Sequence, residues 1–586
     1  MSIDPVTLEV MRNAFQSVAE EMGAALIRTA LSTNIKDRRD CSTAIYTPEG
    51  SLVAQAEHIP LHLGLMPTVV KEVLRRHPPE RLGPGDAVII NDPYISGSHL
   101  PDICMITPVY KEGTLVALLA NLAHHVDIGG ISPGGMPASS SEIFQEGLRI
   151  PPIKLREGGE VKEEILNLIS SNVRTSQETR GDFQAQMAAN NVGERRVLEI
   201  VDRYGASQVL RYMEEIINYS ERRMLAMLEQ LPRGTYRFED YLEGDGFSDD
   251  LIPIKVAVTI EGGNVHVDFT GTSPQVKGSV NCTRAVTLAS VYYAIKCVAD
   301  PDLPSSEGSY KPVKVTTPEG TLVNPRFPAA VSNANINTAQ RIADVVLGAL
   351  ALAVPERVTA ASTGSMSLFT IGGLVPGTNT YFSYVETYGG GQGALWDQDG
   401  MDGVHTNMTN TRNAPTEVIE MTYPLRVERY GLVPDSEGPG AFRGGLGLTR
   451  EIVVLGEETG ITLSTERRKT RPWGLQGGKP GEGSECWLVQ GRERILPTKI
   501  TTTVSSGSKL ILKTAGGGGY GDPLRRDPKS VLWDVREGLI SSERARERYG
   551  VAVNTETWTV MEEETARLRT KSSHPMNDGA RPGPMI

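Results

Sequence analysis

The sequence predicts an α+β protein built from several domains, in which mixed sheets are combined with helices. Short runs rich in Val and Ile, bounded by Gly, Pro, Asn and Asp, are typical of buried strands. Other stretches repeat apolar residues at helical spacing over many turns. The chain has 586 residues, which is too long for one hydrophobic core.

The composition excludes several classes of protein. Hydrophobic residues make up 39% of the chain and charged residues 22%, as in an ordinary soluble protein. A net charge of −12 argues against a surface for nucleic acid or anionic membranes. No apolar run reaches the length of a membrane span, and the N-terminus lacks the pattern of a signal peptide. The five cysteines form no CxxC pair, which predicts free thiols and a cytoplasmic location.

We expect three regions. Residues 1–232 are predicted to form an N-terminal α+β domain. Its first helix begins at Asp4-Pro5, with Asp as the N-cap and Pro at the first helical position. Helical spacing returns from Ile165 to Leu231, with a break near Gly205.

Residues 233–515 are predicted to form a β-rich α+β region. Residues 254–260 and 265–269 are two alternating runs joined by a Gly-containing turn, which indicates a hairpin. Helices are expected near 283–299 and 335–353. Residues 516–586 hold a Gly-rich motif, short helices and a flexible C-terminal tail. We expect the tail after Ser572 to be disordered, because it is polar and rich in Pro and Gly.

Histidines and aspartates collect at the ends of the predicted strands of the first region. Asn91–Asp102 contains His99 and Asp102, and Ala123–Gly130 contains a His-His pair. Apolar runs lead into or out of both stretches, so neighbouring strands would bring their ends together. Pro101 disfavours helix just before it and places His99 and Asp102 on a turn. Asp40, just before another strand-like run, is well placed to join them.

Imidazole nitrogen and carboxylate oxygen are ordinary ligands for zinc, manganese or iron, so this pattern is compatible with a metal site near the strand ends. The alternative is a hydrogen-bonded turn beside one buried and one exposed histidine. His58 and His62 are expected to be structural or to line a pocket. Residues 133–147 form either a solvated connector or a loop over the site, in which Glu142 is a candidate acid or base.

Nothing in the chain predicts a nucleotide site. There is no Walker-type Gly-x4-Gly-Lys-Ser/Thr motif. Asp127–Ser132 is similar to the phosphate loop of actin-like kinases but lacks its threonine. The Gly-rich segments, such as 516–519, are expected to allow tight turns and close backbone packing.

Several motifs together resemble the hydantoinase B/oxoprolinase family. They are Asn-Asp-Pro-Tyr…Gly-Ser-His-Leu-Pro-Asp, then His-His-x-Asp-Ile-Gly-Gly, then Glu-Gly-Leu-Arg-Ile-Pro-Pro, Asp-Phe-Thr-Gly-Thr-Ser and Gly-Gly-Gly-Gly-Tyr-Gly-Asp-Pro. The resemblance runs through nearly the whole chain. It implies a metal held by Asp40, His99, Asp102 and His124, with zinc expected in preference to manganese or iron.

The resemblance also implies an activity and a partner. The family includes second subunits of ATP-dependent hydantoinases, 5-oxoprolinases and caprolactamases, which open cyclic amides. ATP-Mg would be used by a hydantoinase A-like subunit with an actin-like kinase fold, in a heterotetramer of two plus two. A divalent metal lowers the pKa of bound water and so supplies a nucleophile. His125 or Asp127, next to His124, is expected to move the proton or to support the ligands.

Two alternatives stay open at the level of sequence. The family is more distantly similar to a subunit of acetone and acetophenone carboxylases, so the chain could belong to an ATP-dependent ketone carboxylase. It could also be a non-catalytic subunit in which the metal stabilises the fold.

Overall fold

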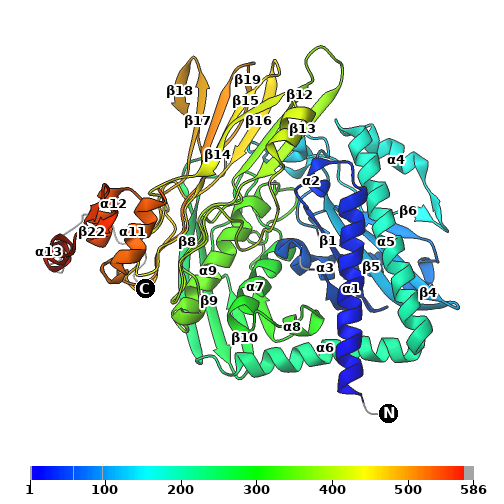
Figure 1. The fold of residues 1–586 in the computed structure, drawn as a ribbon. Coiled ribbons are helices and arrows are strands. Elements are labelled where there is room, and N and C mark those ends of the chain that lie inside the picture. Colours follow the sequence, from blue (N-terminus) through cyan, green and yellow to red (C-terminus); the bar gives the residue numbers. More distant parts are fainter. Residues whose placement is uncertain (1–2, 57, 96, 573–586) are drawn as a thin grey trace.

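A computed structural model describes residues 3–56, 58–95 and 97–572 and confirms the predicted α+β class (Figure 1). The predicted disordered tail after Ser572 lies outside the described residues. Within the described part of the chain, no helix is both long and apolar enough to cross a membrane. The division into three domains stays a prediction.

The first sheet has seven strands, in the order β2-β1-β5-β4-β3-β6-β7, and every neighbouring pair in it is antiparallel. The strands are β1 (Cys41–Tyr46), β2 (Leu52–Gln55), β3 (Ala87–Ile90), β4 (Asp102–Lys111), β5 (Thr114–His124), β6 (Ile153–Glu157) and β7 (Glu160–Val161). The three strands predicted from the apolar runs are therefore neighbours, as expected. Their inner residues are buried on both faces.

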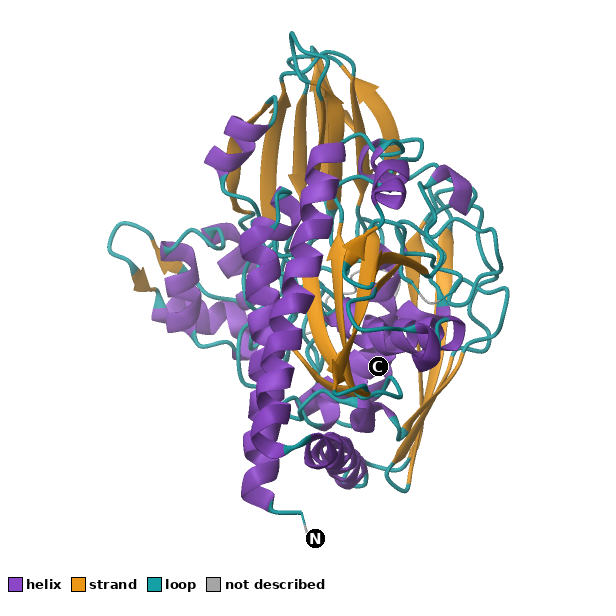
Figure 2. Cartoon of the chain, turned by 90° about the vertical axis from the view of Figure 1, so that its right-hand side faces the viewer, coloured by secondary structure: helices purple, strands orange, loops and turns teal. Residues whose placement is uncertain are grey.

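Helices cover both faces of this sheet. The helices of the first region are α1 (Pro5–Thr29), α2 (Thr33–Lys36), α3 (Pro60–Arg76), α4 (Glu163–Ser170), α5 (Ser176–Tyr204) and α6 (Ala206–Leu228). Asp4 caps α1 by accepting a hydrogen bond from the Thr7 backbone, and Gly205 separates α5 from α6, as predicted. The long helices α1 and α5 lie side by side over one face (Figures 1 and 2), while α3 packs on the other.

A second sheet lies beyond α3. It has the order β11-β10-β9-β8, with β10 and β11 parallel and the other pairs antiparallel. Its elements are β8 (Gly234–Glu243), β9 (Leu251–Glu261), β10 (Asn264–Asp268) and β11 (Val313–Thr316), with α7 (Arg284–Ala299), α8 (Glu307–Tyr310) and α9 (Ala339–Ala351). β9 and β10 form the predicted hairpin. Helix α3 packs on α7 with Gly64 against Ala289. A Cβ at position 64 would lie 2.6 Å from the Ala289 backbone, so this close approach requires glycine.

Two further sheets pack face to face at the top of Figure 1 around a shared apolar core. Their orders are β13-β12-β16-β19 and β14-β15-β20-β17-β18. The strands are β12 (Leu368–Leu374), β13 (Tyr381–Thr387), β14 (Leu425–Leu432), β15 (Leu448–Val454), β16 (Thr459–Ser464), β17 (Glu485–Gln490), β18 (Arg492–Ile495), β19 (Lys499–Val504) and β20 (Lys509–Lys513), and α10 (Thr416–Thr422) precedes β14. Strands β12 and β13 face the first region and close its site from above.

The C-terminal elements lie to one side of the molecule (Figure 1). They are α11 (Pro528–Arg536), α12 (Ser542–Tyr549), β21 (Val553–Asn554), β22 (Thr559–Val560) and α13 (Glu562–Ser572). Asp527 caps α11 ahead of Pro528 by accepting a hydrogen bond from the Lys529 backbone. None of these elements lines the pocket described below.

Candidate metal centre

The ends of three strands of the first sheet meet in one buried volume. Asp102 is the first residue of β4, and His124 is the last residue of β5. The two residues are paired directly across the antiparallel ladder. Asp40 stands just before β1, and its carbonyl accepts a hydrogen bond from the His124 backbone at 3.0 Å. The convergence of strand ends expected from the sequence is therefore present.

His99 reaches the same volume from the turn before β4. The Asp102 backbone N–H bonds to the His99 carbonyl at 3.2 Å, which closes this turn. His99 Nδ1 lies 2.9 Å from the carbonyl oxygen of Ser332. If Nδ1 donates its proton there, Nε2 keeps a lone pair that faces Asp102 and His124. A carbonyl that accepts the other ring N–H in this way fixes the orientation of a metal-ligating histidine.

Three ligand atoms lie very close together. His124 Nδ1 is 2.9 Å from Asp102 Oδ1, His99 Nε2 is 3.1 Å from the same oxygen, and the two nitrogens are 3.1 Å apart. All three side chains are buried. Ligand atoms at tetrahedral positions around zinc would be separated by roughly 3.3 Å, given zinc–ligand bonds of about 2.0 Å. The donor set and its spacing therefore fit a divalent metal.

The electrostatics of the cluster favour a cation. Burial alone would raise the pKa of Asp102, but His99 and His62 together with the His124 hydrogen bond hold that pKa well below its usual value. Burial likewise opposes the charged form of His99, yet the Asp102 carboxylate raises the pKa of His99 above normal. An ionised carboxylate at the centre of a buried cluster requires positive charge beside it, from a proton or from a metal.

Asp40 lies beside the three-residue cluster but is not part of it. The cluster whose ligand atoms all lie within 4.8 Å of one another consists of His99, Asp102 and His124. The Asp40 carboxylate contacts Arg38 Nη2 at 3.8 Å and His62 Nε2 at 3.9 Å instead. Its role as the fourth ligand stays a prediction.

His62 lines the pocket, which is one of the two roles expected for it. It lies in the first turn of α3 and is buried, with Nε2 3.6 Å from Asp102 Oδ2. Its Nδ1 is 3.3 Å from Ser42 Oγ, which also accepts the Ile59 backbone N–H. If the Ser42 hydroxyl donates to Nδ1, the proton of neutral His62 sits on Nε2, facing the two carboxylates.

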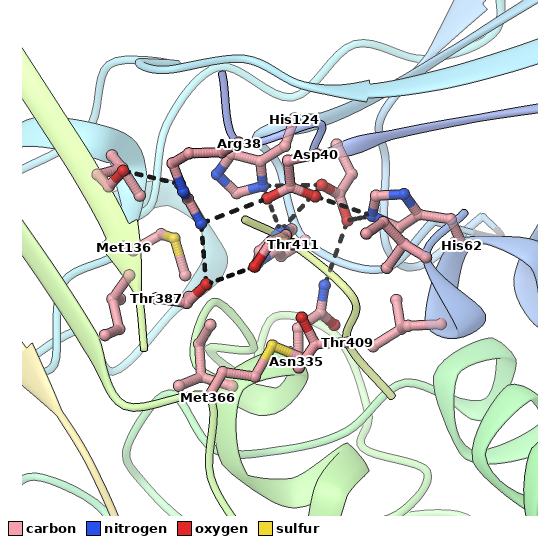
Figure 3. A pocket seen from close by; sticks show the side chains of 17 residues that line it. Arg38, Asp40, His62, His124, Met136, Asn335, Met366, Thr387, Thr409 and Thr411 are labelled. Atoms are coloured by element: carbon pink, nitrogen blue, oxygen red, sulfur yellow. Dashed lines mark hydrogen bonds and ion pairs between the residues drawn. The ribbon is translucent and has the colours of Figure 1, made fainter. Parts of the chain in front are cut away.

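The second region completes the pocket with residues that the sequence did not single out. In Figure 3, Arg38 and His62 lie on opposite sides of Asp40, and threonines close the lower wall. Arg38 donates to the Val385 carbonyl at 2.7 Å and to Thr387 Oγ1 at 2.9 Å. The Asn335 amide lies 3.2 Å from Asp102 Oδ2. The Asn- and Thr-rich runs 333–337 and 406–411 are a feature of the sequence that could have indicated these polar walls.

The pocket is small, and the residues that line it are apolar apart from the polar side chains just described. Its apolar wall is made by Ile59, Leu61, Met136, Ile336, Met366, Leu368 and Val385. The free space is about 30 Å³, which is enough for water but not for a substrate ring. Met136 comes from segment 133–147, which is packed and mostly buried in the structure. That segment is therefore not a solvated connector, and its Met136 lies over the pocket.

His125 lies next to His124 but outside the pocket. Successive residues of an extended chain face opposite sides, and His125 accordingly points toward α5. Its Nε2 is 3.1 Å from Gln186 Oε1, and its ring packs on Phe183 with centroids 4.7 Å apart. Burial lowers the pKa of His125. This geometry supports a scaffolding role beside the cluster.

Asp127 and Glu142 are also away from the pocket. The buried Asp127 carboxylate accepts hydrogen bonds from the backbones of Gly129, Gly134 and Arg174 and pairs with the Arg174 guanidinium at 3.1 Å. It therefore fixes the turn behind the cluster. Glu142 is exposed and caps a short 3-10 helix. The structure does not bring His125, Asp127 or Glu142 to the three-residue cluster.

Comparison with known sequences agrees with the family resemblance of the motifs and extends it over most of the chain. The profile of the hydantoinase B/oxoprolinase family matches residues 4–523. The 5-oxoprolinase 1 of Arabidopsis thaliana is 38% identical over 545 residues, which cover 89% of this chain but only 42% of that protein. The caprolactamase subunit beta of Pseudomonas jessenii is 35% identical over 565 residues, which cover 94% of this chain and 97% of that subunit.

Solved structures share the fold. The crystal structure of the ATP-dependent caprolactamase from Pseudomonas jessenii matches with a TM-score of 0.89 at 33% identity, covering 97% of this chain and 100% of that chain. A nucleotide-free acetone carboxylase matches with a TM-score of 0.90 over 97% of this chain and 83% of that one, but at 20% identity, which shows the fold alone. The chain belongs to the hydantoinase B/oxoprolinase family.

Proposed function

We propose that this chain is the metal-dependent hydrolytic subunit of an ATP-dependent cyclic amidase that opens a hydantoin, 5-oxoproline or lactam ring. One observation carries the proposal: the buried cluster of His99, Asp102 and His124 occurs in a chain that matches a caprolactamase subunit from end to end. The proposed fourth ligand is Asp40. A divalent metal, zinc in preference to manganese or iron, would supply Lewis acidity and an activated water there.

The proposed partner is a hydantoinase A-like subunit that binds ATP-Mg, in a heterotetramer of two plus two. Unstrained cyclic amides are poor electrophiles. Transfer of the γ-phosphoryl group of ATP to the amide oxygen would make the ring carbon more electrophilic. Attack of water on that carbon in this chain would then break the C–N bond, with a proton going to the ring nitrogen, and leave an acyl phosphate. A second water would hydrolyse the acyl phosphate to the ring-opened acid and phosphate. The name of the caprolactamase relative, subunit beta, supports a division of labour between two chains.

Residues of this chain would orient and protonate the reacting groups. His62 presents Nε2 to the pocket outside the three-residue cluster, so it is placed to hold a proton that the departing ring nitrogen needs. Arg38, across Asp40 from His62, and Asn335, beside Asp102, offer donors for an oxygen that gains negative charge. His125 and Asp127 would support the cluster from behind, and Glu142 is too far out to act unless the loop moves.

The five cysteines are free in the structure, and four of them are buried. This supports the prediction of a reducing, cytoplasmic setting.

The test is a screen of the reconstituted complex. The chain is copurified with its ATP-binding partner, and ADP release is measured over hydantoins, 5-oxoproline and lactams. The proposal expects ADP release that depends on one of these rings and yields an opened acid without added bicarbonate. Incorporation of labelled bicarbonate with formation of a C–C bond would assign the chain to ketone carboxylation instead.

A further inference from the structure

A second cavity lies directly behind the pocket that contains His99, Asp102 and His124, which is called the metal pocket below. It has a volume of about 550 Å³, within the range of sites for small molecules. Helices α1, α3 and α7 and the loop after α7 form its walls. Cys297, Pro301 and Asp302 in its lining are exposed, whereas Ala289 and Leu303 are buried. The cavity therefore extends from the surface into the interior.

Only a thin partition separates this cavity from the metal pocket. At the start of α3, Ile59, Leu61 and His62 line the pocket, whereas His58, Pro60 and Leu63 line the cavity. The facing segment alternates in the same way, with Thr409 and Thr411 on the pocket and Asn410 on the cavity. Both walls are one chain thick.

One backbone hydrogen bond joins the two walls of the partition, from Leu61 N–H to the Met408 carbonyl at 3.3 Å. The neighbouring Asn407 has a left-handed backbone, with φ of 53°. Such a residue costs free energy unless the surroundings hold it in place. The segment around Met408 has no regular secondary structure. Among the described residues, the Leu61–Met408 bond is the backbone link between the two walls, while side-chain contacts such as Asn407 to Asp344 and Gln340 to the Thr406 carbonyl hold the Met408 segment from the side away from α3.

The lining of the cavity matches a cyclic amide. Tyr292 and Tyr310 are stacked, with centroids 4.4 Å apart and planes at 15°, and they form a flat wall for a ring. The carboxamides of Gln16, Gln55 and Asn410 in the same lining can each donate and accept. A cyclic amide presents one N–H and one C=O side by side, so carboxamides complement it.

The charges of the lining do not select an anion. Arg12 is paired with Glu9 in a two-bond contact, and Lys296 shares the lining with Asp302. The formal charges of these four groups cancel. A neutral, polar ring is therefore the ligand class that the walls favour.

We propose that this cavity binds the cyclic amide, and that the ring, once phosphorylated with the ATP of the partner, passes through the partition at Leu61 and Met408 to the metal pocket. The inference rests on the proposed function and adds a site to it. The metal pocket has room only for water in this structure, so the ring must be held elsewhere until the partition parts.

Cys297 is a built-in reporter for the test. It is the exposed cysteine at the cavity, and the other four are buried. In the reconstituted complex, the rate of labelling of Cys297 by N-ethylmaleimide is measured with and without one of the neutral rings ε-caprolactam and hydantoin, each added alone. A ring at ten times its Kd should slow labelling about tenfold, because only the unoccupied fraction reacts. Slowing should persist in His99→Ala, because the cavity does not include the cluster, and Cys297→Ser should remove the labelling signal.

A matched pair of tryptophan variants tests the path. Gln16→Trp would fill the cavity from α1, whereas Ser17→Trp would place the same ring on an exposed position of the same helix. We expect kcat/KM for ring opening to fall by at least about tenfold in Gln16→Trp, with metal content unchanged, and to stay near wild type in Ser17→Trp.

The outcomes separate this inference from the proposed function. Turnover of a ring that neither slows Cys297 labelling nor responds to Gln16→Trp would overturn the cavity assignment and leave the proposed function standing. Absence of both turnover and protection would overturn both. Protection without turnover would support the cavity and contradict the hydrolytic role.

Discussion

Asp102 and His124 face each other in register across β4 and β5, with Asp102 Oδ1 2.9 Å from His124 Nδ1. One residue begins its strand and the other ends its strand, so the ladder itself fixes the separation of the two ligand atoms. Sheet positions of this kind hold side chains more rigidly than loops do. The cluster is therefore preorganised by the backbone, with His99 added from the turn.

The first prediction concerns His62. His62→Gln should leave the metal in place, because the ring lies outside the three-residue cluster, but should slow ring opening by roughly 10²–10⁴-fold if it handles a proton. Ser42→Ala removes the partner of Nδ1 and the acceptor of the Ile59 backbone N–H but keeps the imidazole, so it should cost less. The measurement is kcat against pH for both variants with metal content checked. If kcat and its pH profile were unchanged in His62→Gln, His62 would line the pocket without taking part in proton transfer.

The second prediction concerns Glu146, a buried carboxylate behind His99. Its Oε1 accepts from the backbones of Val331 and Ser332 at 3.0 Å and from Ser140 Oγ at 2.8 Å. The Ser332 carbonyl in turn contacts His99 Nδ1. Burial raises the pKa of Glu146 from 4.5 to about 7, although these hydrogen bonds lower it.

The folded state therefore holds the Glu146 proton more tightly than the unfolded chain does. Stability from this group is present below about pH 4.5 and is lost as the pH rises through about 7, by roughly 3 kcal/mol in total. Glu146→Gln should flatten the fall in unfolding free energy across this window. The measurement is denaturant unfolding at several pH values. Equal slopes in wild type and variant would show that Glu146 does not titrate there.

Much of the fold could be predicted from local sequence. The Asp4 cap, the break at Gly205 and the hairpin of β9 and β10 all follow from short-range signals and are confirmed. The strand ends that carry the cluster were also visible, because apolar runs end at polar residues. Such signals act within a few residues, so the sequence reveals them directly.

The remaining walls of the site could not be predicted in the same way. Arg38 meets Thr387 across more than three hundred residues, and no local periodicity encodes that contact. Proximity along the chain was also misleading at His125, since alternation in an extended strand turns it away from His124. Asp127 is used to bind backbone N–H groups of a turn, a role that its sequence position beside two histidines did not indicate.

The third prediction concerns the buried charges around Arg467, which follows strand β16 of the two sheets that pack face to face. Asp344 accepts from Arg467 at 2.5 Å and from Asn407 at 3.0 Å, and Arg467 also pairs with Asp240 at 2.9 Å. Arg467 is fully buried. Asp344→Ala should destabilise the chain by about 3–5 kcal/mol, because it leaves part of a buried positive charge uncompensated. Asp344→Asn keeps the shape and isolates the charge. If chemical denaturation showed that Asp344→Ala lowers the unfolding free energy by less than about 1 kcal/mol, a structural role for the Asp344–Arg467 pair would be contradicted.

The fourth prediction concerns the division of labour. Calorimetry should show no ATP binding by the isolated chain, because its Gly-rich segments lack the strand–Lys–helix context of a phosphate loop. Adding the partner should restore ADP release, and mass measurement of the complex should give two copies of each chain. Tight ATP binding by the isolated chain would mean that one of these segments is a nucleotide site.

The most direct test measures metal content and ring opening together in the complex. Elemental analysis should find close to one divalent ion per chain in wild type and in His266→Ala, a histidine variant on β10 outside the site. His124→Ala should fold, lose the metal and stop forming the opened acid, while ADP release in the partner is recorded separately. A folded His124→Ala complex that lacks metal and still opens the ring at the wild-type rate would contradict the central claim.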